Sequence, residues 1–123
     1  MERYNKNVGD KGEKVATLYL RLKGYKILER NYRRAHGEVD IIARRRKTIV
    51  FAEVKTRTTG VCGTPADSVI YAKQKRLISA AKCYALNADG MDMRFDIIEV
   101  FANIHGKRIK IKKINHIKDA FHS

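Results

Sequence analysis

The stretch GEVDIIARRRKTIVFAEVK (residues 37–55) decides the fold of this chain. Its two apolar runs are rich in β-branched and aromatic residues, which is typical of strands. The four consecutive basic residues between them, 44–47, form a segment short enough for a hairpin turn. A turn centred between Arg46 and Lys47 places Asp40 directly opposite Glu53, because the two residues are equally far from that centre. The sequence therefore predicts a β-hairpin that opposes two carboxylates.

The charges at this point of the predicted hairpin need compensation. Directly opposed residues share a face of the sheet, and like charges there destabilise the pair. Lys55 points to the same face as Glu53, since it lies two residues farther along the strand. Hard divalent cations bind carboxylate oxygens, so a single Mg²⁺ ion could neutralise the negative charges of both Asp40 and Glu53. In the competing interpretation the spacing is a chance match, and Glu53 with Lys55 is an ordinary ion pair on a solvated face.

The net charge of the chain predicts a polyanionic partner. Lys and Arg total 27 against 13 Asp and Glu, which gives a formal net charge of +14. The basic residues are spread along the chain, so they indicate a folded basic surface rather than a disordered tail. Nucleic acid is the expected partner, and its binding should weaken with salt. An anionic membrane surface or an acidic protein partner fits the charge as well, but no stretch has the amphipathic, aromatic face that membrane binding needs.

A third acidic residue, Glu13, lies in an expected helix over about 8–23. Apolar residues recur there at helical spacing, and Gly24 supplies a stop. Asn7 or Asp10 is expected to cap this helix, which puts Glu13 in its first or second turn. A glutamate near a helix start is ordinarily a favourable partner of the helix dipole. Glu13 gains functional meaning only through the larger pattern.

The remaining sequence completes a single α/β domain, because 123 residues leave no room for a second core. We expect a central mixed sheet of about five strands flanked by two helices, since the second helix serves as a crossover between strands. The last strand is expected at an edge, where its lysines discourage association. The core covers about 7–114. The expected elements are strands at 25–33, 37–45 and 48–56, a loop at 57–64, a helix at about 65–87, strands at 93–102 and 107–114, and a short tail at 115–123.

Taken together, these motifs resemble the PD-(D/E)xK nuclease superfamily. The chain is most similar to the small bacterial family called UPF0102, or YraN-like, whose members are related in fold to archaeal Holliday-junction resolvases. The resemblance runs from about Asn7 to Ile114. The proline of the superfamily name is absent, as it often is in resolvase-like members. The resemblance rests on Glu13 with its helix, on Gly37–Asp40, on Phe51–Arg57 with its Glu53-Val54-Lys55 core, and on Arg94–Ile98.

This resemblance implies a restriction-endonuclease-like or resolvase-like fold and a set of site residues. Asp40 and Glu53 would hold Mg²⁺ or Mn²⁺ together with the carbonyl oxygen of Val54, and Glu13 would reach the ion directly or through water. Lys55 would orient the attacking water or neutralise the charge that develops on the scissile phosphate. Glu13, Asp40, Glu53 and Lys55 are thus the expected catalytic residues. Glu38 is a reserve ligand in this scheme, unless it forms a cross-strand ion pair with Lys55.

Contacts to nucleic acid are expected from the basic and polar residues around this site. The loop after Lys55 is a candidate for gripping the substrate backbone, although polar loops are ordinarily connectors. In the resembled superfamily, a Gln or Lys on the second helix can lie near the active site, while a solvated basic face is the simpler interpretation of that helix. The expected nucleic-acid-binding residues are Arg33, Arg34, Arg57, Thr58, Lys73, Gln74 and Lys75.

Two functions from different classes remain open on the sequence, beside the weaker alternative of an accessory protein that binds acidic partners through its basic surface. One is a metal-dependent nuclease that acts on DNA, including branched or repair intermediates. The other is a nucleic-acid-binding module that keeps the nuclease-like fold without catalysis. Clustered acids favour the nuclease, because a pure binder of polyanions gains nothing from them. The resemblance also leads us to expect a homodimer, since a four-way junction offers two symmetric cut sites, and the lack of a transmembrane run or signal peptide leads us to expect a cytoplasmic protein.

Overall fold

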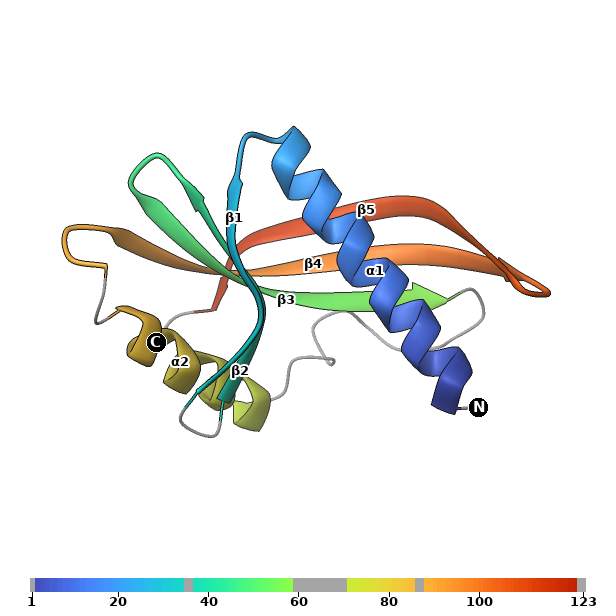
Figure 1. Cartoon of the computed structure of the whole chain (residues 1–123), viewed down its shortest axis with the longest axis horizontal. Coiled ribbons are helices and arrows are strands. Elements are labelled where there is room, and N and C mark those ends of the chain that lie inside the picture. The colour runs from blue at the N-terminus through green and yellow to red at the C-terminus, as the bar shows by residue number, and fades with distance from the viewer. Residues whose placement is uncertain (1, 35–36, 59–70, 86–87, 122–123) are drawn as a thin grey trace.

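The fold is a five-stranded sheet with two helices, and a computed structural model describes residues 2–34, 37–58, 71–85 and 88–121 (Figure 1). The sheet order is β1-β2-β3-β4-β5, so β1 and β5 form its edges. Neither helix, over its described residues, is long and apolar enough to span a membrane. The elements in chain order are α1 (Glu2–Leu22), β1 (Lys26–Arg34), β2 (Gly37–Arg45), β3 (Thr48–Thr58), α2 (Tyr71–Ala85), β4 (Asp92–His105) and β5 (Arg108–Phe121).

The sheet is mixed, as the sequence predicts. Strands β1, β2 and β3 pair antiparallel in sequence order, and β4 pairs antiparallel with β5. Strands β3 and β4 are parallel, and the connection that contains α2 joins them. A parallel pair needs such a crossover, whereas the antiparallel pairs need only short turns. The predicted α/β fold and the edge position of the last strand are therefore confirmed.

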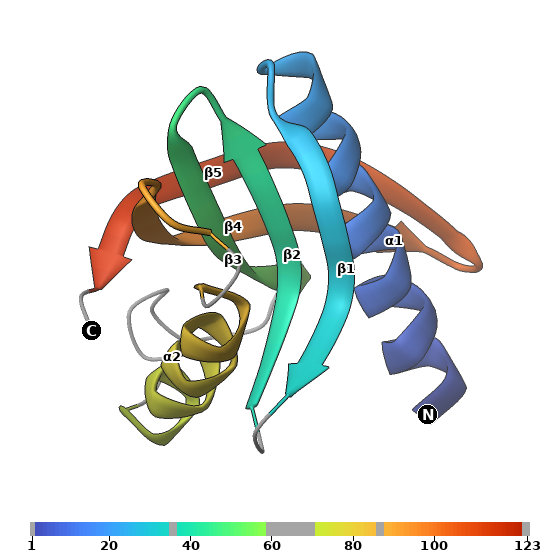
Figure 2. The ribbon, with the colours of Figure 1, turned by 60° about the vertical axis from the view of Figure 1, so that its left-hand side comes forward.

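The two helices cover opposite faces of the sheet, and each face has its own apolar cluster (Figure 2). Alternation along β3 divides the clusters, because successive side chains of a strand point to opposite faces. Phe51 packs on the α2 side with Leu77. Val50 packs on the α1 side with Leu20. All four of these side chains are fully or almost fully buried, so the short chain builds two thin cores.

Several element boundaries differ from the sequence prediction, and β4 continues to His105, three residues past the predicted strand end at 102. Helix α1 begins at Glu2, so Asn7 and Asp10 lie inside it and cannot cap it, and Glu13 lies in its interior. The predicted tail is wrong up to Phe121, because β5 runs to that residue and pairs with β4. β3 continues to Thr58, so the first two residues of the predicted loop belong to the strand. The rest of that loop, and the predicted helix start at 65–70, lie outside the described residues.

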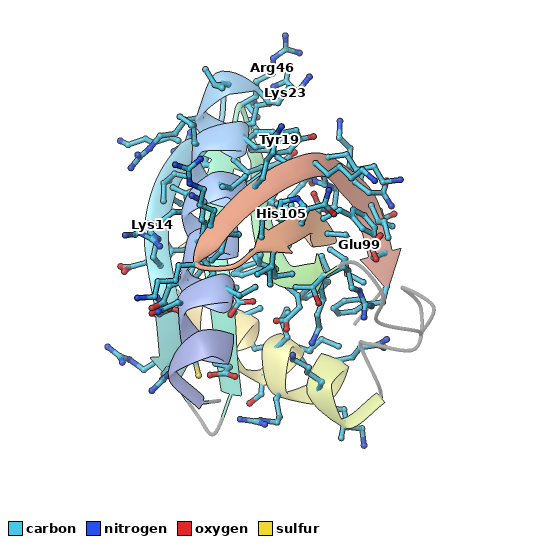
Figure 3. The ribbon with its side chains drawn as sticks, turned by 90° about the vertical axis from the view of Figure 1, so that its right-hand side faces the viewer. Lys14, Tyr19, Lys23, Arg46, Glu99 and His105 are labelled. Atoms are coloured by element: carbon cyan, nitrogen blue, oxygen red, sulfur yellow. The ribbon has the colours of Figure 1, made fainter. Side chains whose placement is uncertain are left out.

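Under α1, a buried polar cluster ties α1, β4, β5 and the connection between α1 and β1 together, and the sequence gives no motif for it. Asp96 of β4 accepts two hydrogen bonds from Arg94, at 2.9 and 3.0 Å, and lies 2.6 Å from His116 Nε2. Arg94 also donates to the hydroxyl of Tyr25 at 2.7 Å. The hydroxyl of Tyr19, on the side of α1 that faces β5 (Figure 3), lies 3.0 Å from His116 Nδ1. Burial raises the pKa of Asp96, but the hydrogen bonds from His116 and Arg94 outweigh it and hold the pKa below its ordinary value.

Close contact between α1 and β3 depends on Gly12. A Cβ atom at Gly12 would lie 1.9 Å from the Thr56 Oγ1 atom and 3.1 Å from its Cβ, whereas a Cβ at Gly9 meets nothing within 4 Å. We expect Gly12→Ala to destabilise the fold by about 1–3 kcal/mol through overpacking. Gly9→Ala, the matched control on the same helix, should be neutral or stabilising by up to about 1 kcal/mol. Urea unfolding of both variants measures the difference, and equal effects would show that α1 does not press on β3 at Gly12.

Candidate functional site

The candidate site lies where β2 and β3 part. Their ladder runs from Arg45 opposite Thr48 to Ile41 opposite Ala52, which is the register that the sequence predicts. The next residues along the two strands are Asp40 and Glu53. There the carboxylate of Asp40 takes the place of a backbone partner, and its Oδ2 accepts a hydrogen bond of 2.8 Å from the Val54 N–H. The hairpin thus places both predicted acids at the point where its ladder ends.

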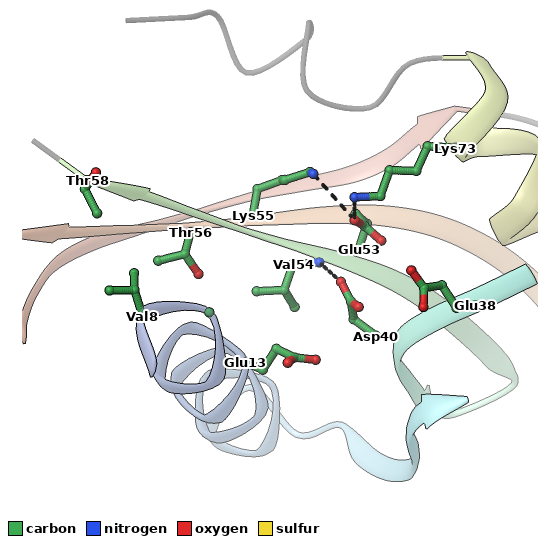
Figure 4. A pocket seen from close by; sticks show the side chains of 11 residues that line it. Val8, Glu13, Glu38, Asp40, Glu53, Val54, Lys55, Thr56, Thr58 and Lys73 are labelled. Atoms are coloured by element: carbon green, nitrogen blue, oxygen red, sulfur yellow. Dashed lines mark hydrogen bonds and ion pairs between the residues drawn. The ribbon is translucent and has the colours of Figure 1, made fainter. Parts of the chain in front are cut away.

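A pocket of about 440 Å³ opens at this point (Figure 4). Four elements contribute to it, because α1 and α2 approach the parted strands from the two sides of the sheet. Glu13 comes from α1, Asp40 from β2, Glu53 and Lys55 from β3, and Lys73 from α2. The four predicted catalytic residues therefore line a single cavity, although up to 42 positions separate them in the chain.

Glu53 is the most enclosed acid of the pocket, with a side chain 4% exposed, and two lysines compensate its charge. Lys55 Nζ lies 3.8 Å from Glu53 Oε1. Lys73 Nζ makes a closer ion pair with the same oxygen. A buried carboxylate needs such partners, because an uncompensated charge away from water is costly. Lys55 belongs to the predicted motif, whereas Lys73 reaches Glu53 from another element and completes the charge balance of this acid.

Asp40 carries the strongest electrostatic conflict in the pocket. Burial, and then repulsion from Glu53, raise the pKa of Asp40 to about 7, although the hydrogen bond from Val54 opposes the shift. The pKa of Glu13 is also raised, chiefly by burial and despite the opposing charge of Arg30. In the described part of the chain neither of these two acids forms an ion pair, whereas Glu53 pairs with two lysines. A bound cation would relieve the repulsion, because opposite charge favours the ionised carboxylate.

The two lysines shift in opposite directions because they share one acid. Burial, and then the adjacent ammonium of Lys73, lower the pKa of Lys55. Burial also acts to lower the pKa of Lys73, but its pairing with Glu53 outweighs burial and raises it. Lys73 is therefore the firmer counterion of Glu53. Lys55 is held less closely by Glu53, so its ammonium is the one available to interact with a ligand in the pocket.

The donor set fits a hydrated divalent cation. Among the described residues, no three His, Cys, Asp or Glu side chains form a group that could by itself hold a metal ion. Mg²⁺, however, is commonly held by one or two carboxylates, with water and substrate phosphate completing its shell. Asp40 and Glu53 supply two carboxylates. Glu13 Oε1 is buried and has no hydrogen-bond partner in the described part of the chain, which is the kind of atom that an ion or its bound water satisfies.

Of the seven predicted nucleic-acid-binding residues, two line the pocket and the other five lie outside its described lining. Thr58 and Lys73 line the pocket. Arg57 lies beside it on β3 and forms an ion pair with Glu99 at 3.8 Å. Arg33 pairs with Glu38 across the rim, at 3.6 Å. The described lining does not include Arg34, on β1, or Gln74 and Lys75, on α2. The alternative ion pair between Glu38 and Lys55 is absent from the described residues, since Glu38 pairs with Arg33 and Lys55 with Glu53.

Two lining residues escaped the sequence analysis: Val8 and Gly9. Helical periodicity points to one of them, because Gly9 lies four residues before Glu13 and so shares its face of α1. A third lining residue, Thr56, begins the segment after Lys55 that the sequence analysis made a candidate for gripping the substrate backbone, and the structure places it in β3. It lies next to Lys55 on β3 and joins the lining only because α1 packs closely against it at Gly12.

Known proteins resemble this chain over the region that contains the site residues. The sequence profile of the uncharacterised protein family UPF0102 matches residues 12–100. This range includes all four predicted catalytic residues, which are three acids and one lysine. A UPF0102 protein of Caldanaerobacter subterraneus subsp. tengcongensis is 44% identical over 98% of this chain and 100% of its own length. A UPF0102 protein of Clostridioides difficile is 46% identical over 95% of this chain and 98% of its own.

A third relative, the UPF0102 protein of Geobacter metallireducens, is 44% identical over 98% of this chain and 97% of its own length. The profile match and the relatives agree with the resemblance that the Glu13, Asp40 and Glu53-Val54-Lys55 motifs indicate. This chain belongs to the UPF0102 family.

Proposed function

We propose that this protein is a Mg²⁺-dependent nuclease that cleaves DNA, with branched or repair intermediates as the preferred substrates. The observation that carries the proposal is that Asp40 and Glu53 lie close together directly beyond the end of the β2–β3 ladder, with Lys55 3.8 Å from Glu53. A pocket with this charge conflict costs folding energy, which is expected where a site is arranged for a ligand. The surrounding charge of +14 suits a nucleic acid.

The residues of the pocket have distinct roles in this proposal. Asp40, Glu53 and the Val54 carbonyl would hold the ion, with Glu13 holding it directly or through water. The ion would supply a water of lowered pKa and stabilise negative charge on phosphate oxygens. In the reaction a water molecule gives up a proton to solvent as its oxygen bonds to phosphorus, the bond from phosphorus to the leaving oxygen breaks, and the leaving oxygen takes a proton from solvent. Lys55 lies beside the developing negative charge, where a compact ammonium stabilises it.

A second candidate function is nucleic-acid binding without catalysis. The specific observation in its favour is that Lys73 and Lys55 already compensate Glu53 from within the protein. If that internal pairing persists with a ligand present, Glu53 contributes little to holding a metal ion. The basic surface would then bind nucleic acid, and the acids would serve only to position the two lysines.

Cleavage assays on labelled DNA test the proposal. The wild-type protein should cut at least one substrate among single-stranded, duplex, flapped and four-way-junction DNA in the presence of Mg²⁺ or Mn²⁺. Glu53→Gln and Lys55→Ala should each lower the rate by about 100-fold or more, because the first removes a carboxylate that would hold the ion and the second removes the ammonium beside the developing negative charge. Gel electrophoresis of the end-labelled products measures both the rate and the position of the cut.

Lys47→Ala serves as the matched control, because Lys47 is an exposed lysine in the turn between β2 and β3, away from the pocket lining. It should cut at nearly the wild-type rate. Salt-sensitive DNA binding by all four proteins, with no cutting of any substrate in either metal, would refute the nuclease and favour the binding module. Cutting that survives in Glu53→Gln would show that the activity resides elsewhere.

A further inference from the structure

A second cavity, of about 220 Å³, lies beside the pocket that contains Glu13, Asp40 and Glu53, which we call the acidic pocket. It is lined by Arg57 and Thr58 of β3, residues 101–103 of β4, and Lys112 and Lys113 of β5. Thr58 lines both cavities, so the two hollows adjoin at the end of β3. A ligand long enough to occupy both would cross β3 at Thr58.

The two cavities have opposite electrostatic character. The acidic pocket is lined by four carboxylates, whereas the described lining of the second cavity contains three cationic side chains and no acidic one. Lys112 and Lys113 are exposed and lie outside the range that the family profile matches. An anion placed in the second cavity would meet these charges without facing a carboxylate in the lining.

The cationic groups of the second cavity are held by neighbouring side chains. Arg57 Nε lies 3.8 Å from Glu99 Oε2, and Glu99 is a fully buried carboxylate on the adjacent strand. The other carboxylate oxygen accepts a hydrogen bond of 2.7 Å from Asn115 Nδ2. The Lys113 ammonium lies 4.7 Å from the centre of the Phe101 ring, within the range of a cation–π contact. Burying Glu99 is costly, and that cost is consistent with a need to fix Arg57.

We propose that the second cavity is a phosphate-binding subsite, where Lys112, Lys113 and Arg57 hold the backbone of a nucleic acid whose neighbouring phosphodiester lies in the acidic pocket. The identity of the ligand rests on the proposed function, but binding at the subsite does not require cleavage. Glu99 acts as the positioning residue for Arg57. The subsite supplies the attraction that the acidic pocket lacks before a metal ion neutralises it.

A binding experiment without metal tests the subsite independently of catalysis. Fluorescence anisotropy would measure the affinity of the full chain for a fluorescein-labelled 20-nucleotide duplex in EDTA, over a series of KCl concentrations. The test variant is Lys112→Gln with Lys113→Gln. The matched control is Arg46→Gln with Lys47→Gln, which removes the same charge from two exposed positions at the β2–β3 turn, at the far end of the sheet from the β4–β5 turn (Figure 1).

Loss of the subsite should change both the affinity and its salt dependence. Each lost phosphate contact lowers the slope of log affinity against log salt by about 0.9 for duplex DNA. The test variant should therefore bind about 10-fold more weakly at low salt, with a slope reduced by about 2, whereas the control should keep nearly the wild-type slope. Equal losses in the two variants would overturn the proposal, because they would show that only the net charge matters.

A membrane surface is the other anionic partner that these lysines fit, and the same variants decide between them. If the test variant keeps its affinity for the duplex but loses binding to vesicles of phosphatidylserine and phosphatidylcholine, the subsite proposal is wrong. If only the test variant binds the duplex more weakly with a reduced salt slope, while no DNA is cut in Mg²⁺ or Mn²⁺, the subsite proposal stands and the nuclease proposal fails. Thermal melting of each variant confirms that the exposed substitutions leave the fold intact.

Discussion

Asp40→Asn is expected to abolish metal-dependent cleavage while making the metal-free protein more stable. The amide keeps an oxygen that can accept the hydrogen bond from Val54, but it removes the charge that burial and Glu53 disfavour. Activity should fall by about 100-fold or more, because one of the two acids expected to hold the ion loses its charge. Opposite changes in activity and stability separate a functional acid from a structural one, since loss of a structural residue lowers both.

The gain in stability should depend on pH in a definite direction. The pKa of Asp40 is about 7 in the folded chain and has an ordinary value of 3.8. Between these values the folded state binds more protons than the unfolded state, so the metal-free wild type loses stability as the pH rises. The stability of Asp40→Asn should not fall in this way, because its amide does not ionise. Its advantage should grow from pH 4 to pH 8 and reach the order of a few kcal/mol in urea unfolding with EDTA present.

Two controls make this prediction specific. Asp89→Asn changes an exposed aspartate before β4 and should alter neither activity nor stability measurably. Mg²⁺ should raise the melting temperature of the wild type, because a ligand that binds only the folded state stabilises it, and it should not raise that of Asp40→Asn. If Asp40→Asn instead lowers stability at pH 8 in EDTA, the carboxylate is structural and the interpretation of the pocket is wrong.

Asp96→Asn is expected to be the most destabilising single substitution considered. Its carboxylate accepts both hydrogen bonds from Arg94, the hydrogen bond of 3.0 Å from the Asp119 N–H, and the contact with His116. Removal of the charge leaves the partly buried Arg94 without its counterion. Breaking a buried ion pair on one side typically costs about 3–5 kcal/mol. For a chain of this length we expect the melting temperature to fall by roughly 10–20 °C.

The pH dependence of this cluster has the opposite sign from that of Asp40. Hydrogen bonds from His116 and Arg94 hold the pKa of Asp96 below its ordinary value of 3.8. The stabilisation is therefore fully present above the unfolded value and is lost as the pH falls through the folded value. The difference between wild type and Asp96→Asn should narrow in acid below about pH 4. Asp92→Asn, an exposed aspartate at the start of the same strand, is the matched control and should melt near the wild type.

Much of the candidate site is predictable from the sequence because it depends on local geometry. The turn between Arg46 and Lys47 and the alternation of the two strands fix the register, and the register alone brings Asp40 to Glu53. Lys55 follows from the two-residue period of the strand. These relations span fewer than 20 residues and need no knowledge of tertiary packing. The resemblance to a known family added Glu13, whose position in the helix interior differs from the predicted position near the start.

The sequence by itself determined the α/β fold class, the mixed sheet, the edge position of the last strand and the β2–β3 register that ends just before the two acids, because periodicity and turn length act over short separations. Tertiary structure alone decided that Lys73 pairs with Glu53, that Thr56 meets α1 at Gly12, and that Arg94, Asp96 and His116 form one buried cluster. The physical reason is that these contacts join residues from different elements. Their distances depend on how helices pack on the sheet, and no periodicity in the sequence encodes them.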